Sequence, residues 1–97
     1  MIIRMITYHA LEGRDVYGWM KEVASNLRGV KGMRHSEFIQ SQDDPSLYGA
    51  IMLFNTKEDL DNYKETGPYR NLVQSLRERW LDESKPVGEQ IFEVIDT

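Results

Sequence analysis

The stretch LYGAIMLFN, residues 47–55, decides the fold of this chain of 97 residues. Eight of its nine residues are apolar or glycine, and no polar residue alternates with them. Such a short continuous run is typical of a strand that is covered on both faces, or of a buried helix segment. The residues Tyr48, Ile51 and Phe54 favour the strand. We therefore expect a central strand here. The two faces of its sheet must each be covered by another layer of structure.

The composition is that of a single domain spanning residues 1–97, and it narrows the possible functions. The net charge of −4 at pH 7 disfavours binding to nucleic acid or to acidic membranes. The chain has no cysteine, which excludes disulfides, thiolate metal sites and a thiol nucleophile. Its apolar runs are shorter than the roughly 18–20 residues that span a bilayer, and residues 2–6 lack the apolar centre of a signal peptide. We expect a cytoplasmic protein with no nucleic-acid or membrane partner.

Hydrophobic periodicity predicts the other elements. The predicted strands cover residues 2–9, 33–42, 47–55 and 89–95, and the predicted helices cover residues 14–27, 57–65 and 68–80. In the first strand, one face consists of Ile2, Arg4, Ile6 and Tyr8, and the other of Ile3, Met5, Thr7 and His9. This order of elements predicts an α+β, ferredoxin-like split βαβ fold, with the helices on one face of a four-stranded antiparallel sheet.

Two local predictions refine this architecture. In the second strand, Met33, His35 and Glu37 are expected to share one face, because alternate residues of a strand do so. Thr56 is expected to cap the helix that follows it.

The second cover is predicted to come from another copy of the chain. All helices lie on one face of the expected sheet, yet three of its strands carry apolar residues on both faces. A monomer would then expose more apolar surface than the roughly 300–600 Å² that is usual. We therefore predict a two-fold symmetric homodimer that packs sheet against sheet. The alternative is a partly apolar face that tolerates contact with water.

Three blocks of sequence carry a resemblance to a known family. The first is the initial strand, followed by Glu12-Gly13 and an amphipathic helix, and the second is Gly29-Val30-Lys31-Gly32-Met33. The third runs from Leu53 to Tyr63 and is followed by Gly67-Pro68-Tyr69. In order and spacing these blocks resemble the antibiotic biosynthesis monooxygenase family of dimeric α+β barrels, over nearly the whole chain.

The resemblance implies an oxidoreductase activity. It implies a dimer with a pocket between the sheet and the helices of each subunit. It also implies oxidation of a small aromatic or quinol substrate by O2, often with no metal or flavin, so we expect no cofactor.

The sequence also departs from the family's pattern. The family often has Trp where Phe54 stands and His where Tyr69 stands. Its haem-degrading branch uses Asn, Trp and His at the places of Thr7, Tyr63 and Val73, and Val73 cannot ligate iron. Haem degradation is therefore not expected. These departures favour, as the alternative to an enzyme, a non-catalytic dimeric module that binds or senses a ligand, and haem binding is a third possibility.

Three residues are the candidate catalytic groups. Tyr63 and Tyr69 flank the break at Gly67-Pro68, where each can bury its ring and turn its hydroxyl toward a pocket. They would hold a phenolic or quinone oxygen and stabilise a developing phenolate; the alternative is that both are core aromatics. His9 at the end of the first strand is a candidate general base, or a partly exposed strand-end residue.

Four further residues are candidate contacts for a small aromatic ligand. Trp19 and Trp80 could line an aromatic pocket, although their helical spacing also fits a plain core. Asn55 follows the central strand and could either bind a ligand or cap the next helix. Thr7 is included through the resemblance alone. The sequence has no His-x-x-His or Glu-x-x-His spacing, so we expect no metal site.

Overall fold

Strand β3 (Leu47–Phe54) lies inside a four-stranded sheet in the computed structural model, which describes residues 1–96. β1 (Ile2–His9) and β2 (Met33–Gln40) pair with its two sides, and β4 (Gly88–Glu93) pairs with the other side of β1. All three pairings are antiparallel, and the strand order is β2-β3-β1-β4. The predicted α+β ferredoxin-like fold is confirmed.

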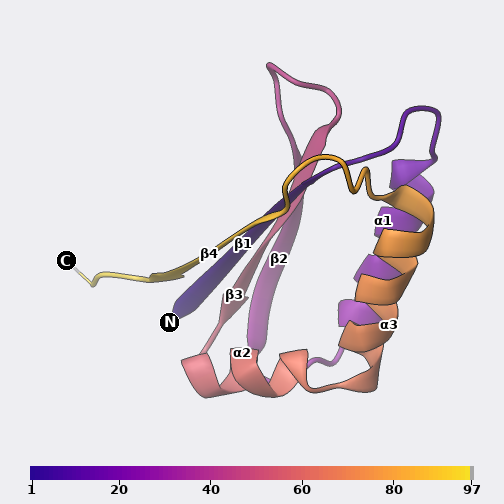
Figure 1. The fold of residues 1–97 in the computed structure, drawn as a ribbon. Coiled ribbons are helices and arrows are strands. Elements are labelled where there is room, and N and C mark those ends of the chain that lie inside the picture. Colours follow the sequence, from indigo (N-terminus) through magenta and orange to yellow (C-terminus); the bar gives the residue numbers. More distant parts are fainter. Residues whose placement is uncertain (97) are drawn as a thin grey trace.

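Three α-helices, α1 (Val16–Leu27), α2 (Lys57–Lys64) and α3 (Gly67–Ser75), lie on one side of this sheet (Figure 1). A π-helical turn, η1 (Leu76–Trp80), continues α3. Helices α1 and α3 run along the sheet, while α2 lies across the end at which β3 leaves it (Figure 1). Within residues 1–96, none of the helices has the length and apolar character needed to cross a membrane.

The α-helices begin where a side chain accepts a backbone N–H that the first helical turn leaves free. Asp15 Oδ1 accepts from the Gly18 amide at 3.0 Å, so α1 begins at Val16 and not at residue 14. Thr56 Oγ1 accepts from the Asp59 amide at 3.1 Å, which confirms the predicted cap of α2.

Three other predicted elements end at least two residues earlier than expected. β2 ends at Gln40, because the Ser41 hydroxyl accepts the amides of Asp43 and Asp44 in the following turn. β4 ends at residue 93, so residues 94–95 of the predicted strand lie beyond it. The predicted helix over residues 68–80 is α-helical only to Ser75, where the π turn takes over.

The alternation predicted for β1 and β3 is confirmed by the burial of their side chains. On the side of the helices, Ala50, Met52 and Phe54 are each at most 6% exposed. In β2 the predicted face of Met33 is wrong, because a bulge between Met33 and His35 inserts an extra residue into the strand. Met33 therefore pairs with Phe54 and packs on the core, on the face opposite to His35.

The centre of the core is formed by Phe54 and Leu60, whose side chains are fully buried. We expect Phe54→Ala to lower the free energy of unfolding by about 3–5 kcal/mol, because the burial of the ring is lost and a cavity remains. Urea unfolding followed by circular dichroism measures the change. Tyr17→Ala is the control, since Tyr17 is 65% exposed and its loss should cost less than about 0.5 kcal/mol. Equal losses in the two variants would contradict the central position of Phe54.

Within residues 1–96, no helix or strand covers the side of the sheet that faces away from the helices (Figure 1). The strand register places apolar side chains on this side. We call it the open face. Its apolar side chains are Ile3, Met5, Ile39, Leu47, Ile51, Leu53 and Phe92. The second cover that the sequence requires is therefore not supplied by this part of the chain itself, and the homodimer stays a prediction.

Candidate functional site

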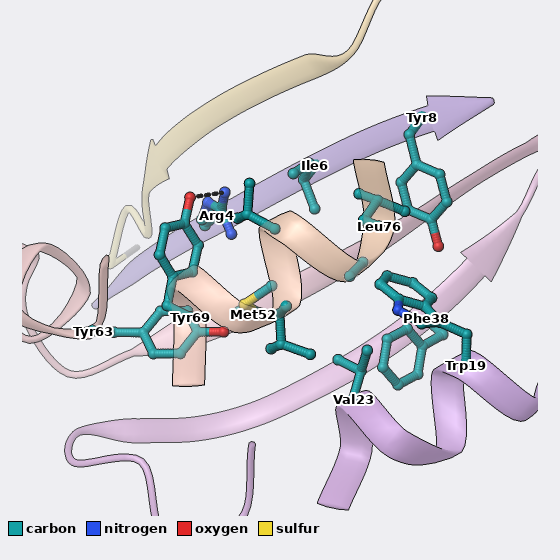
Figure 2. Close-up of a pocket in the computed structure, with 13 residues that line it drawn as sticks. Arg4, Ile6, Tyr8, Trp19, Val23, Phe38, Met52, Tyr63, Tyr69 and Leu76 are labelled. Carbon is teal, nitrogen blue, oxygen red and sulfur yellow. Dashed lines mark hydrogen bonds between the residues drawn. The ribbon is translucent and has the colours of Figure 1, made fainter. Parts of the chain in front are cut away.

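A cavity with a volume of about 60 Å³ lies between the sheet and the helices (Figure 2). The strands β1, β2 and β3 form its floor, and α1, α2, α3 and η1 supply its walls. Most of the lining side chains are aliphatic or aromatic hydrocarbon, for example Ile6 and Met52. Five of them carry polar groups that can direct a ligand, and these are Arg4, Tyr8, Trp19, Tyr63 and Tyr69.

Arg4 is the charged residue of this cavity. It is 3% exposed and is the one buried charged residue among residues 1–96. Its Nε donates to Glu89 Oε2 at 2.8 Å, and its Nη2 donates to the Tyr69 hydroxyl at 3.3 Å (Figure 2). The guanidinium carbon also lies 5.5 Å from the centroid of the Tyr69 ring, within cation–π range. A guanidinium has five N–H donors, which is more than these contacts use.

The carboxylate of Glu89 is shared between two cations. Besides the contact with Arg4, its Oε1 accepts from Lys64 Nζ at 3.0 Å. Partial burial alone would raise the pKa of Glu89, but the hydrogen bonds from Arg4 and Lys64 outweigh burial and hold that pKa below its usual range. One carboxylate between two cations leaves a net positive charge at this end of the cavity.

Tyr63 and Tyr69 lie together, as the break at Gly67-Pro68 suggests. Their ring centroids are 5.2 Å apart in an edge-to-face arrangement, and both rings line the cavity. Tyr63 is 4% exposed, and its hydroxyl points into the cavity (Figure 2). Burial raises the pKa of Tyr63 to about 12. At neutral pH its hydroxyl is therefore protonated and can donate a hydrogen bond, but it is not a base.

Trp19 lines the cavity at the other end, together with Tyr8. The two rings meet edge to face, with centroids 5.7 Å apart. Trp19 is 6% exposed, so it is at once a core residue and a cavity residue, which are the two roles that the sequence left open.

Thr7 and His9 do not lie in this cavity. In β1 they alternate with Ile6 and Tyr8, so their side chains are on the opposite face of the sheet. His9 Nε2 lies 3.3 Å from Asp44 Oδ2, in the turn that precedes β3. No three His, Asp or Glu side chains of residues 1–96 are grouped as a metal site.

Asn55 and Trp80 also lie outside the cavity. Asn55 is exposed, and its Oδ1 accepts from Arg34 Nη1 at 3.3 Å. The cap of α2 is Thr56, so Asn55 does not have its predicted alternative role either. Trp80 packs against the core from η1.

The sequence pattern does not predict Arg4 and its partner Glu89 as site residues. The signal was present, because Arg4 is the one charged residue on a face otherwise formed by Ile2, Ile6 and Tyr8. A buried charge in such a row is costly and therefore points to a partner or a function.

No protein-family model matches this sequence, and no curated protein matches it either. Solved structures do match. An antibiotic biosynthesis monooxygenase is 13% identical in sequence, with a TM-score of 0.82 over 99% of this chain and 100% of that one. A candidate antibiotic biosynthesis monooxygenase from Deinococcus radiodurans is 10% identical, with a TM-score of 0.84 over 100% of this chain and 95% of that one.

A third match is SnoaB from Streptomyces nogalater, a cofactor-independent oxygenase. It is 10% identical, with a TM-score of 0.79 over 99% of this chain and 94% of that one. At sequence identities this low, the matches show the fold of the chain and do not show which reaction it catalyses. The chain therefore has the fold of the antibiotic biosynthesis monooxygenases, as the resemblance in its sequence implies.

Proposed function

We propose that this protein is a monooxygenase of the antibiotic biosynthesis monooxygenase family that oxidises a small aromatic or quinol substrate with O2 and needs no cofactor. The observation that carries the proposal is the buried Arg4 guanidinium in the wall of an otherwise apolar cavity. The match in fold to SnoaB, a cofactor-independent oxygenase, supports it.

The chemistry requires a substrate that gives electrons to O2 directly, and a deprotonated phenol or enol does so. When the substrate loses a proton, negative charge develops on its oxygen, and the Arg4 guanidinium stabilises that charge. A ring carbon then forms a bond to O2, and the resulting peroxide takes up a proton. The hydroperoxide then loses water: its O–O bond breaks, the outer OH leaves, and the hydrogen that remained on that carbon leaves as a proton. The carbon keeps the inner oxygen as a C=O group. One oxygen atom enters the product and the other leaves as water.

The protein's part in this scheme is to bind, to stabilise charge and to exclude water. No His, Asp or Glu of residues 1–96 lines the cavity, and Tyr63 stays protonated at neutral pH. Proton removal is then assisted by Arg4, which lowers the pKa of a bound phenol through its charge. His9 as a general base stays a prediction, and its position on the other face of β1 gives it no contact with this cavity.

A second candidate is the non-catalytic ligand-binding module. Two observations favour it. The cavity volume of about 60 Å³ is below the roughly 300–1,000 Å³ of ordinary ligand pockets, and the lining that residues 1–96 supply holds no acid–base pair. In either case an aromatic ligand enters only if a wall moves. Under both candidate functions, we propose that the protein is a homodimer that assembles through the open face and that it is located in the cytoplasm.

Oxygen uptake with metal-free, flavin-free protein tests the choice, using a panel of hydroquinones, anthrones and naphthols. We expect uptake that depends on the protein, and a fall of about 100-fold in kcat/KM in Tyr63→Phe, because a hydroxyl that donates to the developing phenolate is lost. Tyr17→Phe is the matched control, because this tyrosine is exposed and lies outside the cavity. Full activity of Tyr63→Phe would remove Tyr63 from the reaction. Binding of the panel without uptake would favour the module.

A further inference from the structure

The Tyr8 hydroxyl is a buried polar group without a protein partner. Tyr8 is 2% exposed, and its Oη makes no hydrogen bond within residues 1–96. His9 Nδ1 and Trp80 Nε1 share that property, but Tyr8 is the one of these residues that lines the cavity. Its hydroxyl points into it, toward Phe38 and Trp19 (Figure 2). A buried hydroxyl without a hydrogen bond costs about 1–3 kcal/mol, so a partner in the cavity is expected.

The ring that carries this hydroxyl is held in place from two sides. Trp19 meets it edge to face at 5.7 Å, and Tyr48 stacks against it at 6.4 Å between centroids. Burial also raises the pKa of Tyr8 above its ordinary value, so the hydroxyl remains a donor in neutral and alkaline solution. A fixed donor of this kind is suited to recognise one oxygen of a ligand.

Tyr8 and Arg4 mark the two ends of the cavity. Both side chains project from the same face of β1 and are four residues apart, with Ile6 between them. Their Cα atoms are on the order of 13 Å apart at the rise of an extended strand. The wall between these ends is apolar. The cavity thus has a cationic end, an apolar middle and a neutral donor end.

We propose that Tyr8 determines ligand specificity by donating a hydrogen bond to a second ligand oxygen, at the end of the ligand opposite to the one bound by Arg4. The ligand is then a planar aromatic molecule with an acidic hydroxyl at one end and a hydrogen-bond acceptor at the other. This inference rests on the proposed function only in taking the cavity as the binding site. A ligand with oxygen at one end alone leaves the Tyr8 hydroxyl unpartnered.

The test is calorimetric titration in oxygen-free buffer, so that binding is measured without turnover. The probes are 2,6-dihydroxynaphthalene, which has both oxygens, and 2-naphthol, which has one. We expect the wild-type protein to bind the diol about tenfold more tightly, which is the usual worth of one hydrogen bond. Tyr8→Phe should bind the diol and 2-naphthol with about equal affinity, and its affinity for 2-naphthol should be that of the wild-type protein.

Tyr48→Phe is the matched control. Tyr48 stacks on Tyr8, but its hydroxyl accepts from Gln40 Nε2 at 3.2 Å, outside the cavity. This variant should keep the tenfold preference. The wild-type protein alone gives a second measurement that does not depend on a folded variant. There, 6-methoxy-2-naphthol, which keeps the acceptor, should bind as tightly as the diol, while 6-methyl-2-naphthol should bind like 2-naphthol.

Three results would overturn the proposal: no preference for the diol in the wild-type protein, a preference that survives in Tyr8→Phe, or no binding of either probe. The proposed oxidation fails differently. If the diol preference depends on Tyr8 but no probe is consumed with O2, the proposed role of Tyr8 is supported and the proposed oxidation is contradicted. If 2-naphthol is bound as tightly and oxidised as fast as the diol, the proposed oxidation is supported and the proposed role of Tyr8 is contradicted.

Discussion

Replacing Arg4 with methionine is expected to lower kcat/KM for a phenolic substrate by about 10²–10³-fold, and to weaken the binding of its ionised form. The guanidinium is the charged group in an apolar wall, and a fixed donor at developing negative charge contributes about that much in other enzymes. Methionine follows the aliphatic stem of arginine to about the place of Nε and carries no charge, so the apolar contacts of the stem are kept while the guanidinium is removed.

The fold should tolerate this change. Removing one partner of a buried ion pair is damaging when the other is left buried and alone. Here Glu89 keeps its 3.0 Å contact with Lys64, and its side chain is 37% exposed. Circular dichroism should therefore show a folded variant whose activity is lost.

Lys64→Met is the matched control for Arg4→Met. It removes the other cation that contacts Glu89, but Lys64 does not line the cavity. We expect a change of less than about fivefold in kcat/KM, since the charge lies outside the site and is partly screened by solvent. If Arg4→Met turned over and bound phenolates like the wild-type protein, the assignment of the cavity as the active site would be wrong.

Placing aspartate at residue 51 is expected to convert the proposed homodimer into a monomer. Ile51 lies at the middle of the open face, with Met5 opposite it on β1 and Glu37 opposite it on β2. In a two-fold dimer this face meets its own copy, so one substitution introduces two carboxylates. Burying an unpaired charge in an apolar interface costs several kcal/mol, and Glu37 adds repulsion.

Light scattering after gel filtration measures the result. The wild-type protein should elute with twice the chain mass of 11.4 kDa at tens of micromolar, and Ile51→Asp with the mass of one chain. Ile51→Ala is the control, because it removes apolar area without adding charge and should stay dimeric. The residue lies on the face opposite to the core, so Ile51→Asp should remain folded. A wild-type monomer, or a dimeric Ile51→Asp variant, would contradict assembly through the open face.

The sequence predicts the sheet well because its strongest signals are local. The apolar run of β3 and the alternation of β1 place each side chain on a face, and a residue's face follows from its position in the strand. The bulge beside Met33 and the π turn at residue 76 are not predicted. Each adds one residue to a regular ladder, and that is decided by contacts with distant segments.

For the site, the sequence predicts the two tyrosines and misses the arginine. Tyr63 and Tyr69 are marked by the Gly-Pro break, a local feature. The same alternation predicts that Thr7 and His9 lie on the face opposite to Ile6 and Tyr8. The cavity lies on the side of the helices, which is the face that Arg4 shares with Ile6 and Tyr8. The contact between Arg4 and Glu89 spans 85 residues and has no local signal.

The wall formed by α3 and η1 has a consequence for how this protein can diverge. Its cavity-lining residues Leu72, Val73 and Leu76 are only half-buried, whereas four of the six cavity-lining residues of the sheet are buried, namely Arg4, Tyr8, Ala50 and Met52. A substitution in the wall therefore removes less packing than one in the sheet and costs less stability. Mutational drift can reshape the ligand's surroundings from this side while the scaffold stays intact, which makes α3 the evolvable half of the site and β1 its constrained half.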